Sequence, residues 1–377
     1  MNILIILIQL ITHMPEILSI KSYSGFKLIK LQTKNDLDFK KIYEFQVNHT
    51  DNNIWSYYKN GSGMNIDIMI SKVDYQNFIS LLNKLDIEYA IKLDDIQKLI
   101  DFQKNEAYIA RLSISMTSFD FEYYPRMAEV YYWFEFLAEK YPKLVTIIDI
   151  GESYEGRRMK ILKIGRDTGS KKPAFFVDGG IHAREWPTVT TAMYFISRTN
   201  FFVLKTSHIR VSLFKYLIAC SHGVAYDNPC EVIYQGLSPF SEIETRNLAD
   251  FIRSRRWDIL SYLTIHAYSQ MWMYPFAYTY DNAPDHEELS DLMREAKKSA
   301  PNYKIGSVAQ LLYAVTGSSL DWAYDDMKIK YSFVIELKDM GHGFLLPSTK
   351  ILPVASEVWT IYEYIISYVL NRETGYK

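Results

Sequence analysis

Apolar residues in the first third of the chain follow two kinds of spacing. Continuous or alternating apolar runs, as in β-strands, occupy residues 25–32, 53–58, 65–71 and 87–93. Apolar residues at helical spacing occupy residues 35–46, 72–86 and 94–106. The resulting order is the ferredoxin-like split pattern, with Asn35 or Asp36 as the cap of the first helix. The pattern therefore predicts a small α+β unit of a size that folds alone.

The rest of the chain alternates helix and strand signals, without an internal repeat. Strand-like runs occupy residues 144–151, 159–165, 174–180, 258–267 and 331–339. Helical spacing occupies residues 125–141, 188–199, 242–256 and 349–370. This alternation predicts an α/β domain with a largely buried sheet. Between the two units, residues 110–124 are expected to form a linker, where Arg111 is a natural cut point for a trypsin-like protease.

Composition and charge narrow the class of protein. At 377 residues, the chain has room for one large and one small domain. Lys and Arg number 42 against 44 Asp and Glu, a balance that gives no indication of a nucleic-acid partner. Tyrosine is frequent, at 30 residues, which suits the binding of polypeptides, although a local compositional bias explains it equally well.

The N-terminus has the features of a targeting segment. Residues 3–11 are almost wholly apolar, which is the length of a signal-peptide core and too short for a membrane span. We therefore expect a signal peptide over residues 1–20 and a secreted protein, the alternative being a buried strand. The glycosylation triplets at Asn48 and Asn60 agree with secretion. No other segment is long and apolar enough to span a bilayer, so no membrane partner is expected.

The chain has two cysteines, Cys220 and Cys230. In a secreted protein they are candidates for a disulfide that closes a short loop. Two free thiols are the alternative, and the sequence does not separate the two.

The strongest chemical signal lies in FFVDGGIHAREWPT, residues 175–188. A strand-like run ends at two glycines and is followed by His182 and Glu185, three residues apart. In open α/β sheets, ligands bind at the carboxyl ends of the strands. Two His and one Glu with a water are a known zinc hydrolase set, and His266 ends a second apolar run. A lone His at a strand end is usually structural, but three candidate ligands that follow buried strands predict one metal site.

Glu336 is the candidate general base. It lies within the apolar run 331–337, where a carboxylate is costly unless it is paired or functional. Metal hydrolysis needs a group that takes a proton from the bound water. The alternatives are a salt bridge to Lys338 or exposure at the end of the strand.

Several longer motifs resemble the carboxypeptidase A/B family of secreted zinc metallocarboxypeptidases. These motifs are GGIHAREW, TIHAYSQ, GSSLDWAYDDMKIKYSFVIELKD and GFLLPSTKILPVASEVW. The resemblance covers most of residues 115–200 and 223–370, and residues 21–110 resemble the activation segment of procarboxypeptidases. It implies an activation domain at 21–111 and a catalytic domain at 112–377. The implied catalytic fold is a mixed, mostly parallel twisted sheet with helices on both faces.

The resemblance also assigns the metal centre. It implies that His182, Glu185 and His266 bind one zinc ion. The zinc would polarise the scissile carbonyl and activate a water. Glu336 would act as the general base and then as the proton donor to the leaving amine.

The substrate contacts that the resemblance implies lie on three elements. Arg184 would line the cleft, and Tyr313 would close over the C-terminal residue of the substrate. Members of the family set their specificity at the position of Leu320, where an acidic residue accompanies basic substrates. Leu320, with Val308 and Val315 nearby, implies an apolar pocket for aliphatic or aromatic C-terminal residues, because an unpaired Lys there would be costly.

The resemblance breaks between residues 199 and 223, where the family has a much longer stretch. That stretch holds the arginines that grip the substrate carboxylate and stabilise the oxyanion, and an Asp that supports the first zinc His. A bidentate Arg is the group suited to a carboxylate. Arg198 and Arg210 are candidate substitutes, and we expect both to lie elsewhere. The catalytic domain is therefore expected to be incomplete around residues 200–223.

These observations predict a secreted, monomeric zymogen that a trypsin-like protease activates and that hydrolyses the C-terminal bond of peptides and proteins. The first alternative is a catalytically impaired relative that still binds zinc or peptides. The second is a skipped exon or retained intron, with a longer working protein. Other zinc hydrolases with similar ligands, such as deacylases, are a distant third, and the block from Tyr313 to Glu336 speaks against them.

Overall fold

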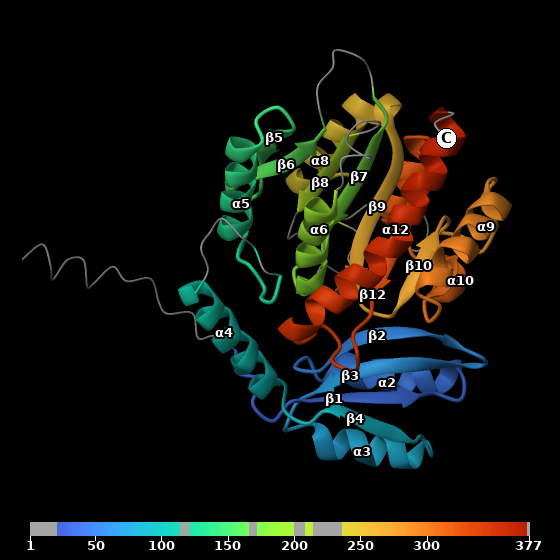
Figure 1. The fold of residues 1–377 in the computed structure, drawn as a ribbon. Coiled ribbons are helices and arrows are strands. Elements are labelled where there is room, and N and C mark those ends of the chain that lie inside the picture. The colour runs from blue at the N-terminus through green and yellow to red at the C-terminus, as the bar shows by residue number, and fades with distance from the viewer. Residues whose placement is uncertain are drawn as a thin grey trace, which may run out of the picture.

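The computed structural model describes residues 21–113, 119, 121–165, 172–199, 208–213 and 236–374. The expected signal peptide and both cysteines lie outside these residues. Figure 1 shows two units, with the smaller N-terminal one (blue to cyan) beneath the larger one.

The N-terminal unit is the predicted split βαββαβ fold. Its elements are β1 (Lys27–Gln32), α2 (Asp36–Asn48), β2 (Asn53–Asn60), β3 (Gly63–Ile70), α3 (Tyr75–Lys84), β4 (Tyr89–Leu93) and α4 (Ile96–Ser113). The sheet has the order β2-β3-β1-β4, and all its neighbours are antiparallel. Helix α2 begins where expected, because the Asn35 side chain accepts a hydrogen bond from the N–H of Asp38 at 2.9 Å. Apolar side chains of α2 and α3, Ile42 and Phe78 among them, pack on one face of this sheet.

Helix α4 extends into the predicted linker. We expected the closing helix to end near Glu106 and Arg111 to lie beyond it, but α4 continues to Ser113. Residues 106–112 contain neither Gly nor Pro, and Ala, Leu, Glu and Arg among them favour helix. Arg111 is therefore in the last turns of a helix, and the expected domain boundary at 111 falls inside it.

The larger unit is built on an eight-stranded mixed sheet. Its strands are β5 (Val145–Glu152), β6 (Arg158–Ile164), β7 (Ala174–Gly179), β8 (His208–Leu213), β9 (Ile259–Ala267), β10 (Met271–Tyr274), β11 (Lys304–Ser307) and β12 (Tyr331–Leu337). Their order is β11-β10-β12-β9-β7-β8-β6-β5, with β12, β9, β7 and β8 mutually parallel. The predicted fold class is thus confirmed, and the carboxyl ends of β7, β9 and β12 meet at one edge.

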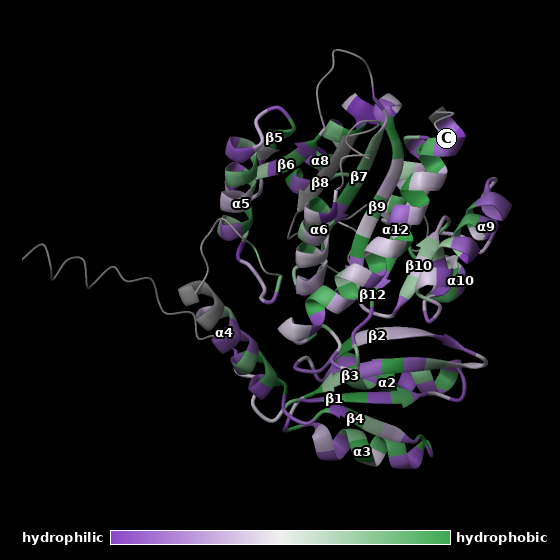
Figure 2. Ribbon diagram, viewed as in Figure 1, coloured by the Kyte–Doolittle hydropathy of each residue, from purple (hydrophilic) through white to green (hydrophobic). Residues whose placement is uncertain are grey.

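Helices cover both faces of this sheet (Figure 1). The larger core lies under α5 (Met127–Lys140), α6 (Trp186–Arg198), α9 (His286–Ala296) and α12 (Ile351–Thr374). The opposite face packs against α8 (Ile243–Arg255). Short turns of helix include α10 (Val308–Leu311) and α11 (Ser319–Asp321). In Figure 2 the central strands are mostly hydrophobic, as a sheet covered on both sides requires. Among the described residues, no helix has the length and apolarity needed to cross a membrane.

Strand β8 lies in the segment where the resemblance breaks. It pairs in parallel with β7, from Ala174 opposite His208 to Gly179 opposite Leu213, and antiparallel with β6. A strand thus joins β6 to β7 within this segment, and the expected incompleteness of the catalytic domain around residues 200–223 stays a prediction. The sequence pattern did not predict this strand, nor β10, β11 and α9. Four-residue strands such as β10 and β11 carry too few positions for a readable period.

Candidate active site

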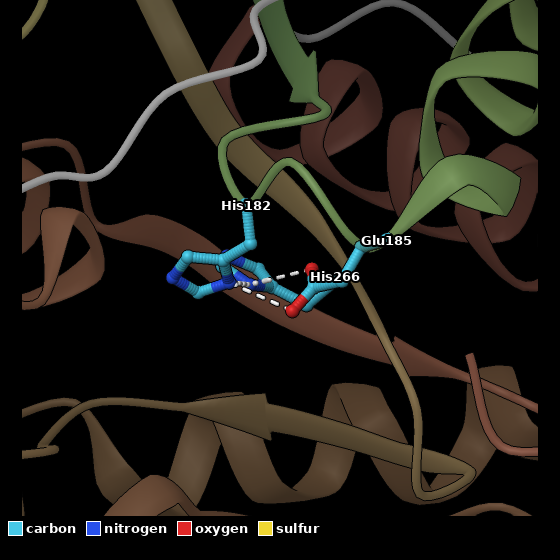
Figure 3. A group of neighbouring side chains, drawn as sticks. All are labelled: His182, Glu185 and His266. Carbon is cyan, nitrogen blue, oxygen red and sulfur yellow. Dashed lines mark hydrogen bonds and ion pairs between the residues drawn. The ribbon is translucent and has the colours of Figure 1, made fainter. Parts of the chain in front are cut away.

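His182 and Glu185 lie in the turn between β7 and α6. Gly180 has a φ of 81°, and its N–H donates a 2.8 Å hydrogen bond to the hydroxyl of Thr188 in α6. A Cβ on Gly179 would lie 2.7 Å from the carbonyl oxygen of Thr188, so the approach of the helix requires glycine at this strand end. The two glycines thus hold the turn tightly against α6 and present His182 and Glu185 on one side of it (Figure 3).

His266, near the carboxyl end of β9, joins them. The Nδ1 atom of His182 is 2.7 Å from Oε1 of Glu185 and 3.2 Å from Nδ1 of His266. Oε2 of Glu185 is 3.4 Å from Nδ1 of His266. One ligand atom of each residue lies within 4.8 Å of the others, a spacing that one metal ion can bridge. The three side chains point toward a common centre in Figure 3, so their geometry fits the zinc set expected from the sequence.

The charges of the candidate ligands shift the pKa values of Glu185 and His182. Burial works to raise the pKa of the Glu185 carboxyl, but the charges of His182 and His266 outweigh it and lower this pKa to about 2. Burial works to lower the pKa of His182, and the Glu185 carboxylate outweighs it and raises this pKa. The Glu185 carboxyl is thus ionised at neutral pH, as a metal ligand must be.

Glu336 lies next to the three candidate ligands. It is the register partner of His266 across the parallel pair of β12 and β9. Burial and the negative charge of Glu185 raise its pKa to about 8. A cation bound at Glu185 would offset the second cause and favour the ionised form. Among the described residues its Oε2 atom has no hydrogen-bond partner. Lys338 pairs instead with Glu357, at 3.5 Å, which removes the salt-bridge alternative.

The predicted specificity residues gather in one apolar cluster. Leu320 is fully buried, and Val308 and the partly buried Val315 pack in the same group. The neighbouring carboxylate of Asp321 accepts hydrogen bonds from the backbone N–H groups of Ala277, at 2.9 Å, and Tyr278, at 3.1 Å. Its charge is therefore used within the fold and does not add an acidic group for a basic substrate.

The three arginine candidates lie in different parts of the larger unit. The guanidinium of Arg184 lies 4.3 Å from the ring centre of Phe344, where the charges of Glu185 and Glu336 act on it. Arg198 is exposed in the last turn of α6, and thirteen helical residues from Glu185 correspond to about 20 Å. Arg210 is the register partner of Phe176 in β7, about 10 Å along the strand before the edge that carries the metal centre. Arg198 is thus too distant to contact a substrate at the metal centre.

Strand β2 of the N-terminal unit lies over these residues. Nη1 of Arg184 donates to Oδ1 of Asn53 at 3.2 Å. The ring of Tyr57 stacks on that of Tyr313, with centres 4.5 Å apart and planes 7° apart. Ser56 contacts Ser269 through a 3.2 Å hydroxyl pair. Both expected substrate contacts, Arg184 and Tyr313, are therefore engaged by the N-terminal unit.

A buried group of charges joins the two units beside β2. Nζ of Lys92 in β4 lies 2.8 Å from Oδ2 of Asp67 and 2.7 Å from Oδ2 of Asp339, and the hydroxyl of Tyr268 donates to Oδ2 of Asp67 at 2.9 Å. We refer to these four residues as the Lys92 cluster. Burial works to lower the pKa of Lys92, but the two carboxylates outweigh it and raise this pKa. The sequence predicted Lys92 to lie in a strand, and the structure confirms this; its side chain is only 14% exposed.

Two further polar residues next to the metal centre were not identified from the sequence. Asp178 in β7 and Thr264 in β9 are buried, and Oγ1 of Thr264 donates to Oδ1 of Asp178 at 2.6 Å. A carboxylate inside an apolar strand, the signal that identified Glu336, was also present at Asp178.

Comparison with known proteins agrees with this geometry. The sequence profile described as "Zinc carboxypeptidase" matches residues 130–201 and 210–361, and the "Carboxypeptidase activation peptide" profile matches residues 29–103. The chain is 30% identical to mouse (Mus musculus) carboxypeptidase A1, over 90% of this chain and 92% of that protein. It is 35% identical to carboxypeptidase B of Astacus astacus, over 66% of this chain and 98% of that protein.

A solved structure shares the two-unit fold. The crystal structure of thrombin activatable fibrinolysis inhibitor superposes with a TM-score of 0.81 at 26% identity, over 92% of this chain and all of that one. The carboxypeptidase A of Helicoverpa armigera superposes with a TM-score of 0.78 at 18% identity, over 94% of this chain and 99% of that one, which shows the fold.

Proposed function

Because the chain belongs to the zinc carboxypeptidase family and carries its activation peptide, we propose that it is a secreted zymogen that removes C-terminal residues from peptides and proteins. The observation that carries the proposal is the meeting of His182, Glu185, His266 and Glu336 at one edge of the sheet. Three ligands and one adjacent carboxylate are the groups that metal-assisted peptide hydrolysis requires.

Each residue has a distinct task in this proposal. A zinc ion held by His182, Glu185 and His266 would polarise the scissile carbonyl and lower the pKa of a bound water. The Glu336 carboxylate accepts the proton of the attacking water and returns it to the nitrogen of the leaving amine. Arg184 lines the cleft and orients the substrate.

In this proposal the apolar cluster around Leu320 sets the preferred substrate. The cluster includes Val308 and Val315, and Tyr313 lies in the segment between them. A substrate ending in an aliphatic or aromatic residue buries apolar surface there, whereas an unpaired lysine would be desolvated without a partner. We therefore assign the chain a preference for apolar C-terminal residues.

The N-terminal unit keeps the enzyme inactive in this proposal. Strand β2 uses Arg184 and Tyr313, the groups that a substrate would need, and the Lys92 cluster holds the unit in place. A trypsin-like protease would cut near Arg111, in the last turns of α4, and so allow the unit to dissociate. Because helical backbone resists proteolysis, the cut requires local fraying of that helix end.

A second candidate function is a zinc- or peptide-binding protein without exopeptidase activity. The position of Arg198, far from the metal centre, favours it, because a carboxylate of the substrate then lacks this candidate partner. Loss of one oxyanion donor alone lowers a rate by about 10²–10³.

One experiment on the full chain distinguishes the two functions. The protein is treated with trypsin, its zinc content is measured, and peptides ending in Phe, Leu or Lys are incubated with it. Release of Phe and Leu, faster than Lys, and its loss in Glu336→Gln support the carboxypeptidase. One bound zinc without release of any residue, once the cleaved N-terminal unit has been removed, supports zinc binding without exopeptidase activity. Absence of zinc contradicts the carboxypeptidase and the zinc-binding form of the second function.

A further inference from the structure

Asp178 and Thr264 are connected to the metal centre through His266. They are register partners in the parallel pair of β7 and β9. Thr264 and His266 are two residues apart on β9, so their side chains lie on the same face of the sheet. Oγ1 of Thr264 lies 2.6 Å from Oδ1 of Asp178 and 3.0 Å from Nε2 of His266. The pairing of the strands thus creates a chain from carboxylate to hydroxyl to imidazole.

The direction of these hydrogen bonds follows from counting protons. An ionised carboxylate only accepts, so the single hydroxyl proton of Thr264 goes to Asp178. The oxygen of Thr264 is then an acceptor toward His266, and Nε2 of His266 must carry a proton. In a neutral imidazole the other nitrogen, Nδ1, then keeps its lone pair. Nδ1 is the atom that faces Glu185 and His182 in the metal centre.

From this geometry we infer that Asp178 and Thr264 are positioning residues that select the metal-binding tautomer of His266. The inference rests on the proposed zinc function and deepens it. Both residues are buried, with Asp178 at 0% and Thr264 at 1% exposure, so water does not compete for these hydrogen bonds. The same two contacts hold the imidazole ring in its orientation and increase its basicity as a ligand.

The two histidines differ in whether Nε2 has a hydrogen-bond partner. Among the described residues, both hydrogen-bond contacts of His182 involve Nδ1, and no partner of Nε2 is found. The side chain of His182 is 41% exposed, whereas that of His266 is 13% exposed. The relay through Thr264 therefore supports one half of the centre, and His266 is the ligand whose geometry is set before a metal binds.

The test measures zinc affinity by competition with a chelator, on the full chain. Thr264→Val keeps the shape and removes the relay, and we expect zinc to bind about 10–100-fold more weakly. Thr264→Ser keeps the hydroxyl and should bind zinc like the unchanged protein. Asp178→Asn keeps an acceptor but loses the charge, so its effect should be intermediate, and it serves as the second variant if Thr264→Val fails to fold.

The matched control is Thr191→Val. Thr191 lies on α6, is equally buried, and its hydroxyl has no hydrogen-bond partner among the described residues. This variant should leave zinc affinity unchanged. If Thr264→Val and Asp178→Asn fold and bind zinc as tightly as this control, the inference is overturned. If the unchanged protein binds no zinc, the proposed function fails, which is a separate result.

Discussion

The candidate metal centre and the N-terminal unit that lies over it are held in place in different ways. On the catalytic side, His266 and Glu336 lie on the neighbouring parallel strands β9 and β12, and His182 lies in the turn that follows β7, the other neighbour of β9. On the covering side, the N-terminal unit contributes side-chain contacts, among them those of β2, of the Lys92 cluster and of Gln103 in α4. The candidate catalytic groups are thus fixed by the sheet, whereas the position of the N-terminal unit over them depends on individual side-chain contacts.

The largest expected effect concerns the catalytic side. Glu336→Gln removes the proton acceptor but keeps the shape, and we expect kcat to fall by about 10²–10⁴-fold. The zinc content should not change, because Glu336 is not one of the three expected ligands. A variant that retains its rate would exclude Glu336 as the base. The measurement is the release of C-terminal Phe after trypsin treatment, with zinc determined on the same sample.

The next effect concerns the covering side. Lys92→Met leaves Asp67 and Asp339 without their shared cation, and breaking such a buried group costs about 3 kcal/mol, or roughly 100-fold in affinity. The cleaved N-terminal unit should then inhibit the catalytic unit much more weakly. Residual inhibition after cleavage is the measured quantity.

The matched control for Lys92→Met is Lys34→Met. Lys34 pairs with Asp86 on the surface of the same unit, where the two side chains are 53% and 95% exposed. An exposed pair contributes little, so inhibition should stay unchanged. Equal effects of the two variants would show that the Lys92 cluster does not hold the units together.

Acid should weaken the same contact. Burial works to raise the pKa of Asp339, but Lys92 and backbone N–H groups outweigh it and lower this pKa below its ordinary value of 3.8. The contribution of Asp339 is therefore fully present above pH 3.8 and is lost as the pH falls through the lowered pKa. Gel filtration of the cleaved protein should show the units together at pH 5 and 7, with dissociation beginning only below pH 3.8. A difference between the unchanged protein and Lys92→Met that does not shrink as the pH falls below 3.8 would contradict this origin.

The smallest expected effect concerns the stacked rings. Tyr57→Ala removes the contact with Tyr313, and such aromatic pairs contribute about 0.5–1.5 kcal/mol beyond their buried area. We expect inhibition by the cleaved unit to weaken by about 10-fold or less. An effect as large as that of Lys92→Met would place the main contact in β2.

The sequence predicted the residues whose role depends on a strand end. His182, Glu185 and His266 each follow or end an apolar run, and the parallel order of those runs brings the ends together. The end of α4 was predicted wrongly, near Glu106 instead of Ser113. Residues 106–112 contain no Gly or Pro that would end a helix, so local propensity marks no boundary there. The domain boundary and the cut at Arg111 stay predictions.

What the sequence determined by itself is the local order of elements and the identity of the chemical groups, since hydrophobic period, glycines and polar residues in apolar strands are local signals. Only the tertiary structure decided the rest. The pairing of Asp178 with Thr264, the contact of Lys92 with Asp339 and the place of β8 between β6 and β7 each join residues distant in the chain. The register of strand pairs and the packing of one unit on another set these contacts, and neither is encoded in any single segment.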